Sequence, residues 1–308
     1  VQISDENVHH VRELMDEVFG VENFVSIISF TSTSGIPGLT LSRAGDYIIW
    51  YAKEKTKVKY RQLFFYKEDK VTHYNLVLEA NGKVRNITTE ERENLSLLSA
   101  GAKLAASQSL TSQGETKTDN EVDLKGKKYL PGLGQHWKTT VEGIKNLFQK
   151  GRIIFSGGSS IRYLRLKEDF PVTAINNIWL DTVIGSQEKQ YVVQTSEKTI
   201  HRCLIMTTDP GDLVLDITCG SGTTAYVAEN WGRRWITCDT SRVAITLAKQ
   251  RLMTASFDYY ELAHPHEGVG SGFKYKTVPH ITLKSIANNE PPGQETLYDR
   301  PFVDSKRL

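Results

Sequence analysis

The last third of the chain alternates short apolar runs with polar loops. The apolar run 213–215 predicts a strand that is covered on both faces of a sheet. Gly220 and Gly222 follow, and glycine permits backbone angles and close approaches that a side chain would block. Two threonines then begin a helix, which we expect to run from 223 to about 230. This order predicts a strand, a binding loop and a helix.

A second strand and helix follow directly. The pattern predicts a strand over 233–239 and a helix from Ser241 through Leu252. Asp216 ends the first strand and Asp239 ends the second, 23 positions later. Open parallel sheets bind ligands at the carboxyl ends of their strands. The two carboxylates are therefore candidates for one binding site.

The first fifty residues predict further parts of the same sheet. Segments 23–30 and 46–52 are rich in β-branched and aromatic residues, as strands are, and 31–43 between them has the composition of a loop. Before them, Asp5 is expected to cap a helix that Gly20 ends.

The middle of the chain predicts a small β-rich insertion. Asn81-Gly82 is typical of a tight hairpin turn, here between 74–79 and 83–87. The other predicted elements are a helix from 90 to about 107, a helix over 139–150 and a strand over 152–155.

Composition narrows the class of protein. The 308 residues are 39% apolar, which suffices for one large or two smaller cores. No run of eighteen apolar residues occurs, so we expect no membrane span. The three cysteines and the pair His9-His10 lack metal-ligand spacing, so we expect no metal site. The net charge of +2 means that any nucleic-acid surface must be a local patch.

The two acids favour S-adenosylmethionine as the ligand. Asp216 can face the ammonium of its methionine part, and Asp239 can accept bonds from both ribose hydroxyls. A nicotinamide dinucleotide is the main alternative, because Gly220-Ser-Gly-Thr-Thr-Ala225 satisfies G-x-G-x-x-A. Four residues separate that strand from the first glycine, however, and Asp216 would repel a pyrophosphate. A Walker-type phosphate loop is excluded because no Gly-Lys-Ser or Gly-Lys-Thr occurs.

The segment from Asp216 to Thr224, with 191–202 before it, resembles the β group of amino-methyltransferases that act on DNA. It is most similar to modification subunits of type III restriction systems. Their loop is usually Asp-Pro-Phe-x-Gly-Ser-Gly-Thr-Thr, and this chain has Ile217 in place of the proline. Their preceding helix often reads Lys-Pro-Glu-x-Leu-x-x-Arg. The residues that match it here are Gln194, Glu197 and Arg202, whereas Thr195 and Ser196 depart from it.

The resemblance, together with the strand-end pattern, gives the candidate residues. Those for the cofactor are Tyr191, Gln194, Asp216, Thr218, Cys219, Gly220, Ser221, Gly222, Thr223, Asp239, Thr240 and Ser241. Basic residues that could contact DNA phosphates are Lys55, Lys57, Lys59, Arg61, Arg152, Arg162 and Arg165.

The catalytic tetrapeptide of these enzymes, Asp/Asn/Ser-Pro-Pro-aromatic, is absent. Pro291-Pro292 is followed by glycine and lacks the aromatic residue that stacks on an extruded base. In the β group this motif precedes the cofactor loop. We therefore expect it before Val1, and expect residues 1–308 to be a fragment that is inactive by itself.

The predicted fold is α/β, with a doubly wound Rossmann-like methyltransferase sheet and an inserted α+β target-recognition domain. The expected divisions are 1–53, part of the catalytic fold; 54–170, the insertion; 171–262, the S-adenosylmethionine-binding part; and 263–308, a truncated C-terminal extension.

The function implied is site-specific methylation of adenine N6 in double-stranded DNA, within a bacterial or archaeal cytoplasm. Cytosine-N4 methylation and a catalytically silent module that binds cofactor and DNA are the alternatives, with a nicotinamide dehydrogenase as a third. The resemblance also implies a restriction partner with helicase and nuclease activity, and a homodimer.

Overall fold

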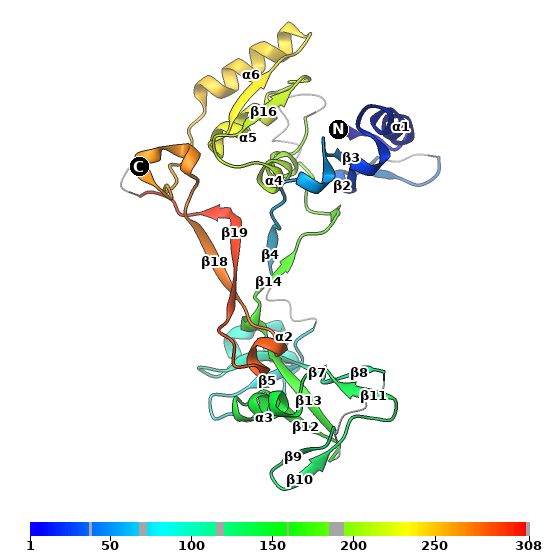
Figure 1. Cartoon of the computed structure of the whole chain (residues 1–308). Helices are drawn as coiled ribbons and strands as arrows, with labels where there is room; N and C mark the ends of the chain where they lie inside the picture. The colour runs from blue at the N-terminus through cyan, green and yellow to red at the C-terminus, as the bar shows by residue number, and fades with distance from the viewer. Residues whose placement is uncertain (37–38, 68–72, 115–119, 159, 185–193, 306–308) are drawn as a thin grey trace. The chain divides into compact units, whose positions relative to one another are not determined.

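The computed structural model describes residues 1–36, 39–67, 73–114, 120–158, 160–184 and 194–305 (Figure 1). It divides into two compact units. The first unit comprises Val1–Phe64, Ala174–Lys276 and Leu297–Leu308, and the second comprises Phe65–Thr173 and Thr277–Thr296.

A four-stranded sheet forms one part of the first unit. Its strand order is β1 (Gln2–Ile3), β3 (Arg43–Tyr51), β2 (Phe24–Ile36) and β15 (Ile178–Trp179). β3 is antiparallel to both of its neighbours, and β15 is parallel to β2. The helix α1 (Val8–Phe19) precedes β2.

Two boundaries in this region differ from the sequence prediction. Asn7, not Asp5, occupies the N-cap position of α1, while Gly20 ends the helix with φ of +85°. β2 continues to Ile36, into the segment predicted as a loop, because its backbone still pairs with β3 there after an irregularity in register.

The strand, loop, helix, strand and helix predicted from 213 onward are present. They are β16 (Leu213–Asp216), α5 (Thr223–Asn230), β17 (Arg234–Thr237) and α6 (Arg242–Thr254), and β16 pairs with β17 in parallel. The helix α4 (Glu197–Thr207) comes before them.

The prediction that all these strands share one sheet is wrong for the described residues. β16 and β17 form a separate two-stranded sheet. Leu213 and Leu215 are 53% and 64% exposed, so the strand is not covered on both faces as its apolar run predicted. An apolar run indicates that a strand can be buried, but its neighbours in space must supply the cover.

Helices α4 and α5 connect the two sheets through a shared core. Ile28 and Trp179 come from the four-stranded sheet, Leu204 from α4 and Val227 from α5, and all four side chains are buried in one cluster. Val214 of β16 packs against this cluster. One face of the β16–β17 sheet is therefore fixed against the helices.

The second unit contains a five-stranded antiparallel sheet. Its order is β12 (Ile153–Ser156), β13 (Ser160–Leu166), β7 (Lys103–Ser109), β5 (Leu76–Leu78) and β6 (Val84–Asn86). Gly82 has φ of +83° in the turn between β5 and β6, which confirms the predicted hairpin. The helix α3 (Val141–Gln149) confirms the one predicted over 139–150.

The long helix predicted from 90 to 107 is wrong. The α-helix there is only α2 (Thr89–Glu93), which is followed by a 3-10 turn at Leu95–Leu97, and Thr88 and Glu91 form a capping box at the start of α2. Asn94 ends α2, and 103–109 becomes strand β7, which pairs with β13 and β5. Pairing with strands distant in sequence has overridden the local helical pattern.

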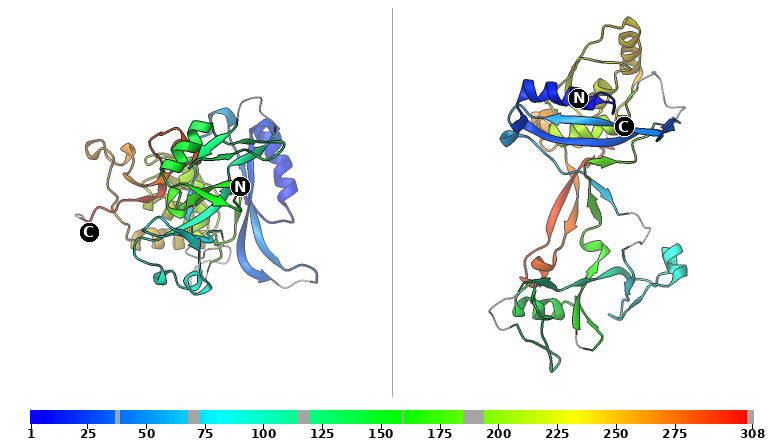
Figure 2. Two further views of the ribbon diagram at one scale, coloured as in Figure 1. Left: turned by 90° about the horizontal axis from the view of Figure 1, so that it is seen from below. Right: turned by 90° about the vertical axis from the view of Figure 1, so that its right-hand side faces the viewer.

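The remaining elements are short. Further strand pairs are β4 (Phe64–Tyr66) with β14 (Val172–Ala174), β8 (Thr111–Gln113) with β11 (Gln135–Trp137), β9 (Val122–Leu124) with β10 (Lys127–Tyr129), and β18 (Tyr275–His280) with β19 (Gly293–Pro301). The last helix is α7 (Leu283–Ala287), and two further views of the chain are given in Figure 2.

The two units do not follow the predicted divisions in every segment. Residues 54–64 belong to the first unit, although the sequence analysis assigned them to the insertion. Residues 277–296, predicted as part of a C-terminal extension, belong to the second unit. The role of the second unit in target recognition stays a prediction.

His201 of α4 predicts a dependence of stability on pH. Its ring stacks on Trp231 with centroids 4.5 Å apart, and its Nε2 atom is buried without a hydrogen-bond partner among the described residues. Burial first, and the positive charges of Arg202 and Arg233 next, lower the pKa of His201 from 6.5 to about 4. Between these values the unfolded chain binds a proton that the folded chain does not, so stability falls as the pH falls.

We expect His201 to remove up to about 3 kcal/mol of stability between pH 6.5 and pH 4. His201→Phe keeps a ring on Trp231 and cannot titrate. Thermal unfolding of both proteins across this range should show the smaller loss for the variant. Equal losses would contradict a neutral buried histidine.

Candidate cofactor site

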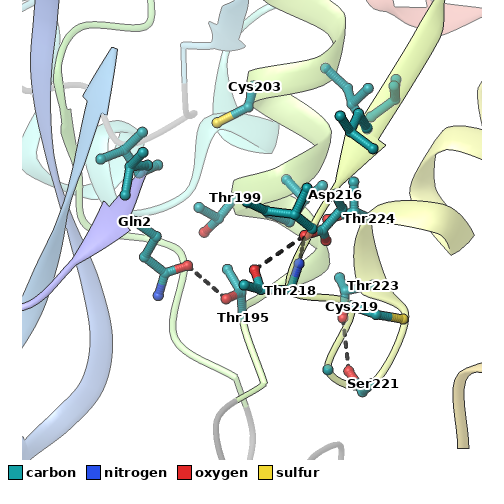
Figure 3. A pocket seen from close by; sticks show the side chains of 18 of the residues that line it. Gln2, Thr195, Thr199, Cys203, Asp216, Thr218, Cys219, Ser221, Thr223 and Thr224 are labelled. Carbon is teal, nitrogen blue, oxygen red and sulfur yellow. Dashed lines mark hydrogen bonds between the residues drawn. The ribbon is translucent and has the colours of Figure 1, made fainter. Parts of the chain in front are cut away.

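A cavity of about 690 Å³ in the first unit contains most of the predicted cofactor residues. Its walls are β1, the segment before α4, one face of α4, and β16 with the loop that follows (Figure 3). Cavities of this size commonly hold small molecules in proteins. The strand-end position predicted for the site is the position of the cavity.

Asp216 provides the charged side chain in this cavity. Its Oδ1 accepts hydrogen bonds from the backbone N–H of Thr218 at 3.0 Å and from the Thr218 hydroxyl at 3.2 Å. No lysine, arginine or histidine side chain is among the described residues that line the cavity, and Asp216 is their one charged side chain. The cavity therefore suits a cationic group and disfavours a phosphate.

Asp239 holds the binding loop to the next strand end. Its Oδ2 accepts from the backbone N–H of Gly220 at 2.9 Å, and its Oδ1 accepts from that of Ser241 at 2.8 Å. These backbone donors, Ser241 first, lower the pKa of Asp239 below its usual value. Asp239 does not itself line the cavity, so its first role in this structure is to position Gly220.

Gly222 positions the loop against α6. Its φ of +76° lies in the left-handed region, and it occupies the N-cap position of α5. A Cβ atom at Gly222 would lie 2.7 Å from the Cβ of Ala248 in α6. The glycine is therefore needed for close packing of the loop on a helix, and it does not line the cavity.

Arg251 of α6 was missed by the sequence analysis. Its guanidinium donates to the Ser221 carbonyl at 3.2 Å and to the Thr223 hydroxyl at 3.1 Å, and it forms an ion pair with Glu197 of α4. It also lies 4.6 Å from the centre of the Tyr226 ring. This one side chain connects the loop to two helices, and only the tertiary structure reveals it.

Three further lining residues were not predicted, although their spacing could have indicated them. Thr195, Thr199 and Cys203 recur every four residues, which places them on one side of α4 and its approach. The Thr195 hydroxyl donates to the Gln2 side-chain oxygen at 2.7 Å. Thr199 is fully buried, and its hydroxyl has no partner among the described residues.

The predicted cofactor residues thus fall into three groups. Those that line the cavity are Gln194, Asp216, Thr218, Cys219, Gly220, Ser221 and Thr223. Those that support the loop or its surroundings without lining the cavity are Gly222, Asp239, Thr240 and Ser241. Tyr191 lies outside the described residues.

The basic residues predicted near position 55 lie in the first unit, where ion pairs hold most of them. Lys57 pairs with Glu54 at 2.7 Å, and Lys59 with Asp212 at 2.8 Å. Arg61 pairs with Asp209. These contacts attach the segment to the turn before β16, while Lys55 is exposed.

The basic residues predicted in the second unit differ in environment. Arg152 forms a bidentate pair with buried Asp169, with N–O distances of 2.9 and 2.7 Å. Arg162 donates to the Ser107 hydroxyl at 2.5 Å. Arg165 is half-buried near Lys67, whose pKa is lowered to about 8 by burial first and by Arg165 and Lys167 next. Arg152 is therefore structural, whereas Arg165 belongs to a group of like charges.

The sequence gives no clear role to Asp181, and the structure places it in an ion pair. Its carboxylate forms a bidentate pair with Arg202 of α4, at 2.8 and 2.7 Å, and lies 3.3 Å from the Lys198 ammonium. Arg202 is buried. The pair therefore anchors α4, which forms one wall of the cavity.

Residues 1–250 match the model of the N6/N4 methyltransferase family, described as DNA methylase, so the chain belongs to this family. It is 23% identical over 305 residues to the probable type III restriction-modification enzyme HindVI Mod subunit of Haemophilus influenzae, covering 82% of this chain and 40% of that protein. It is 25% identical over 260 residues to the type II methyltransferase M.EcaI of Enterobacter cloacae, covering 82% of this chain and 52% of that protein. The resemblance to modification subunits is confirmed, and the chain spans about half or less of these relatives.

Two solved structures are similar at low identity. The M1.HpyAVI complex with S-adenosylmethionine is 14% identical, with 82% of this chain and 72% of that chain covered and a TM-score of 0.38. The cytosine-N4-specific PvuII DNA methyltransferase is 15% identical, with 92% of this chain and 63% of that chain covered and a TM-score of 0.33.

Among the described residues, no helix is both long and apolar enough to cross a membrane. The same residues include no group of three or more histidine, cysteine or acidic side chains placed to hold a metal ion.

The substitution Gly222→Ala should lower the free energy of unfolding by more than the cost of placing a side chain on a left-handed backbone. A side chain with left-handed φ costs roughly 1–2 kcal/mol, and the contact with Ala248 adds to this. Gly151→Ala is the control, because Gly151 has φ of +68° at the left-handed end of α3, where Arg152 N–H donates to the Leu147 carbonyl, and nothing lies within 4 Å of the added Cβ. Urea unfolding should show the larger loss at Gly222, and equal losses would contradict the close packing of α6.

Arg152→Ala should reduce the free energy of unfolding by about 3 kcal/mol or more, because it leaves the buried carboxylate of Asp169 unpaired. Arg162→Ala removes one hydrogen bond and should cost about 1 kcal/mol. Chemical unfolding of both variants tests the difference. A loss at Arg152 no greater than that at Arg162 would show that Arg152 is not needed for the fold.

Proposed function

We propose that the chain is the cofactor-binding and target-recognition part of a DNA methyltransferase that transfers a methyl group from S-adenosylmethionine to adenine N6. The observation that supports S-adenosylmethionine as the cofactor is the lining of the cavity, which has a carboxylate and no basic side chain among its described residues. S-adenosylmethionine presents an ammonium and a sulfonium. A dinucleotide would instead bring its pyrophosphate toward Asp216.

The residues of the loop fit that ligand in chemistry. Asp216 uses Oδ1 for Thr218, and a carboxylate has further lone pairs that can accept from an ammonium. Asp239 accepts one backbone bond on each oxygen, so each oxygen can accept a second bond from a ribose hydroxyl. The cofactor supplies the electrophilic methyl group, while these residues bind and orient it.

The pairing of β16 with β17 through α5 supports a doubly wound methyltransferase sheet as the complete architecture. The second unit is then the inserted target-recognition domain. Arg162 and Arg165 are its candidate phosphate contacts, together with exposed Lys55 of the first unit. A double-stranded DNA substrate, a cytoplasmic restriction-modification role, a nuclease-helicase partner and a homodimer complete the proposal.

Cytosine N4 is the second candidate target. The family model covers both N6 and N4 amines, which are exocyclic amines of similar geometry. Mass analysis of nucleosides from DNA treated with the full-length protein distinguishes them. N6-methyladenine supports the proposal, N4-methylcytosine replaces it, and cofactor binding without either product indicates a silent module.

Calorimetric titration with S-adenosylmethionine, and with NAD as the matched ligand, tests the cofactor. We expect binding of S-adenosylmethionine only, weakened at least tenfold in Asp216→Asn because a charge-assisted contact is lost. Asp258→Asn, an exposed acid outside the cavity lining, should leave the affinity unchanged. Binding of NAD only would overturn the assignment.

A further inference from the structure

The strands β8 and β11 of the second unit form a ribbon of their own. β8 follows β7 in the chain, but among the described residues it pairs only with β11 (Figure 1). One end of the ribbon is fixed. Trp137 is buried in the core of the second unit and donates from Nε1 to the Asn120 carbonyl at 2.7 Å, and the N–H of Lys138 donates to the Leu110 carbonyl at 2.7 Å. The ribbon is therefore a rigid element held at one end.

Two glutamines lie side by side at the other end of the ribbon. Gln113 is directly opposite Gln135 in the antiparallel register. The N–H of Gly114 donates to the Gly134 carbonyl at 3.1 Å, so the glutamines form the neighbouring pair without backbone hydrogen bonds, in which opposite Cα atoms are about 4.5 Å apart. Both side chains are exposed, and neither amide has a hydrogen-bond partner within the described part of the chain. The ribbon thus presents two adjacent free carboxamides.

An apolar side chain accompanies these amides. Leu133 lies two residues before Gln135, between two glycines, and is fully exposed. A single exposed leucine is ordinary on a protein surface. Here it adds an apolar group to an end of the ribbon that already carries two free amides.

Two cations lie near the fixed end of the ribbon. The Lys138 ammonium donates to the Ser109 carbonyl at 3.0 Å, and Arg162 of β13 is the register partner of Ser109. Arg162 donates to the Ser107 hydroxyl at 2.5 Å. Neither cation forms an ion pair with a described acid, in contrast to Arg152. Both charges are therefore available to an external anion such as a phosphate.

The major groove of B-form DNA fits this set of groups. It is about 12 Å wide and admits a two-stranded β-ribbon, and the carboxamide of glutamine both donates to and accepts from the edge of adenine there. Successive bases of a strand are about 3.4 Å apart along the axis, which two neighbouring glutamines can span. An apolar side chain contacts the methyl group of thymine in the same groove. The major groove of double-stranded RNA is too narrow for such a ribbon.

We propose that the β8–β11 ribbon enters the major groove of the target DNA, where Gln113 and Gln135 read two neighbouring A·T base pairs. Leu133 contacts a thymine methyl at the same step, while Lys138 and Arg162 bind phosphates beside the groove. This inference rests on the proposed function and deepens it, because it names the element that reads the recognised sequence. That sequence then contains two neighbouring A·T pairs.

Selection of bound duplexes from a random DNA pool by the full-length protein, followed by sequencing, tests the reading residues without requiring catalysis. The wild type should select a motif with two neighbouring A·T pairs. Gln113→Ala and Gln135→Ala should each lower discrimination about tenfold at one of these pairs. Gln108→Ala is the matched control, since Gln108 is an exposed glutamine of β7 outside the ribbon.

The outcomes separate this inference from the proposed function. A wild-type motif without neighbouring A·T pairs, or one that both ribbon variants retain unchanged, would overturn the assignment of the ribbon and leave target recognition standing. Selection of no motif by the wild type would overturn both. Gln113 and Gln135 are exposed, so neither substitution should change the thermal midpoint.

The salt dependence of DNA affinity tests the cations. Lys138→Ala should weaken binding to the selected duplex and to an unrelated duplex alike, and should reduce the slope of log K against log salt concentration by about 0.9. Lys83→Ala is the control, because Lys83 is exposed in the turn between β5 and β6 and should leave the slope unchanged. An unchanged slope for Lys138→Ala would contradict DNA that runs along the ribbon.

Discussion

The parallel pairing of β16 with β17 is the constraint on which the site depends. Parallel strands require a crossover, here α5, and the pairing places the ends of both strands at one edge of the sheet. Asp216 and Asp239 are thereby brought beside the loop between β16 and α5, although they are far apart in sequence. The carboxylate of Asp239 then fixes Gly220, and the carboxylate of Asp216 faces the cavity.

Charged side chains connect the elements around this edge. Arg251 connects the loop to α4 and α6, and the Arg202–Asp181 pair anchors α4. Arg152 forms the same kind of buried pair in the second unit. A basic residue in the sequence is therefore a weak indicator of DNA contact in this chain, because it can instead form an ion pair with an acidic residue within the fold. Arg165 and Lys67 differ, since each lies near the positive charge of the other, with Asp169 as the acid nearby.

The chemistry and the architecture point to one functional arrangement. In the function that we propose, the cavity with an acidic wall would receive the cationic cofactor and the second unit would recognise DNA.

The sequence by itself determined the local elements of the site. The apolar run, the two glycines and the helix start at Thr223 are short-range signals, and seven of the predicted cofactor residues line the cavity. Only the tertiary structure decided that 103–109 is a strand, that Arg251 holds the loop and that Leu213 and Leu215 are exposed. These properties depend on partners distant in the chain, and hydrophobic periodicity records how a segment can be buried, not which segment covers it.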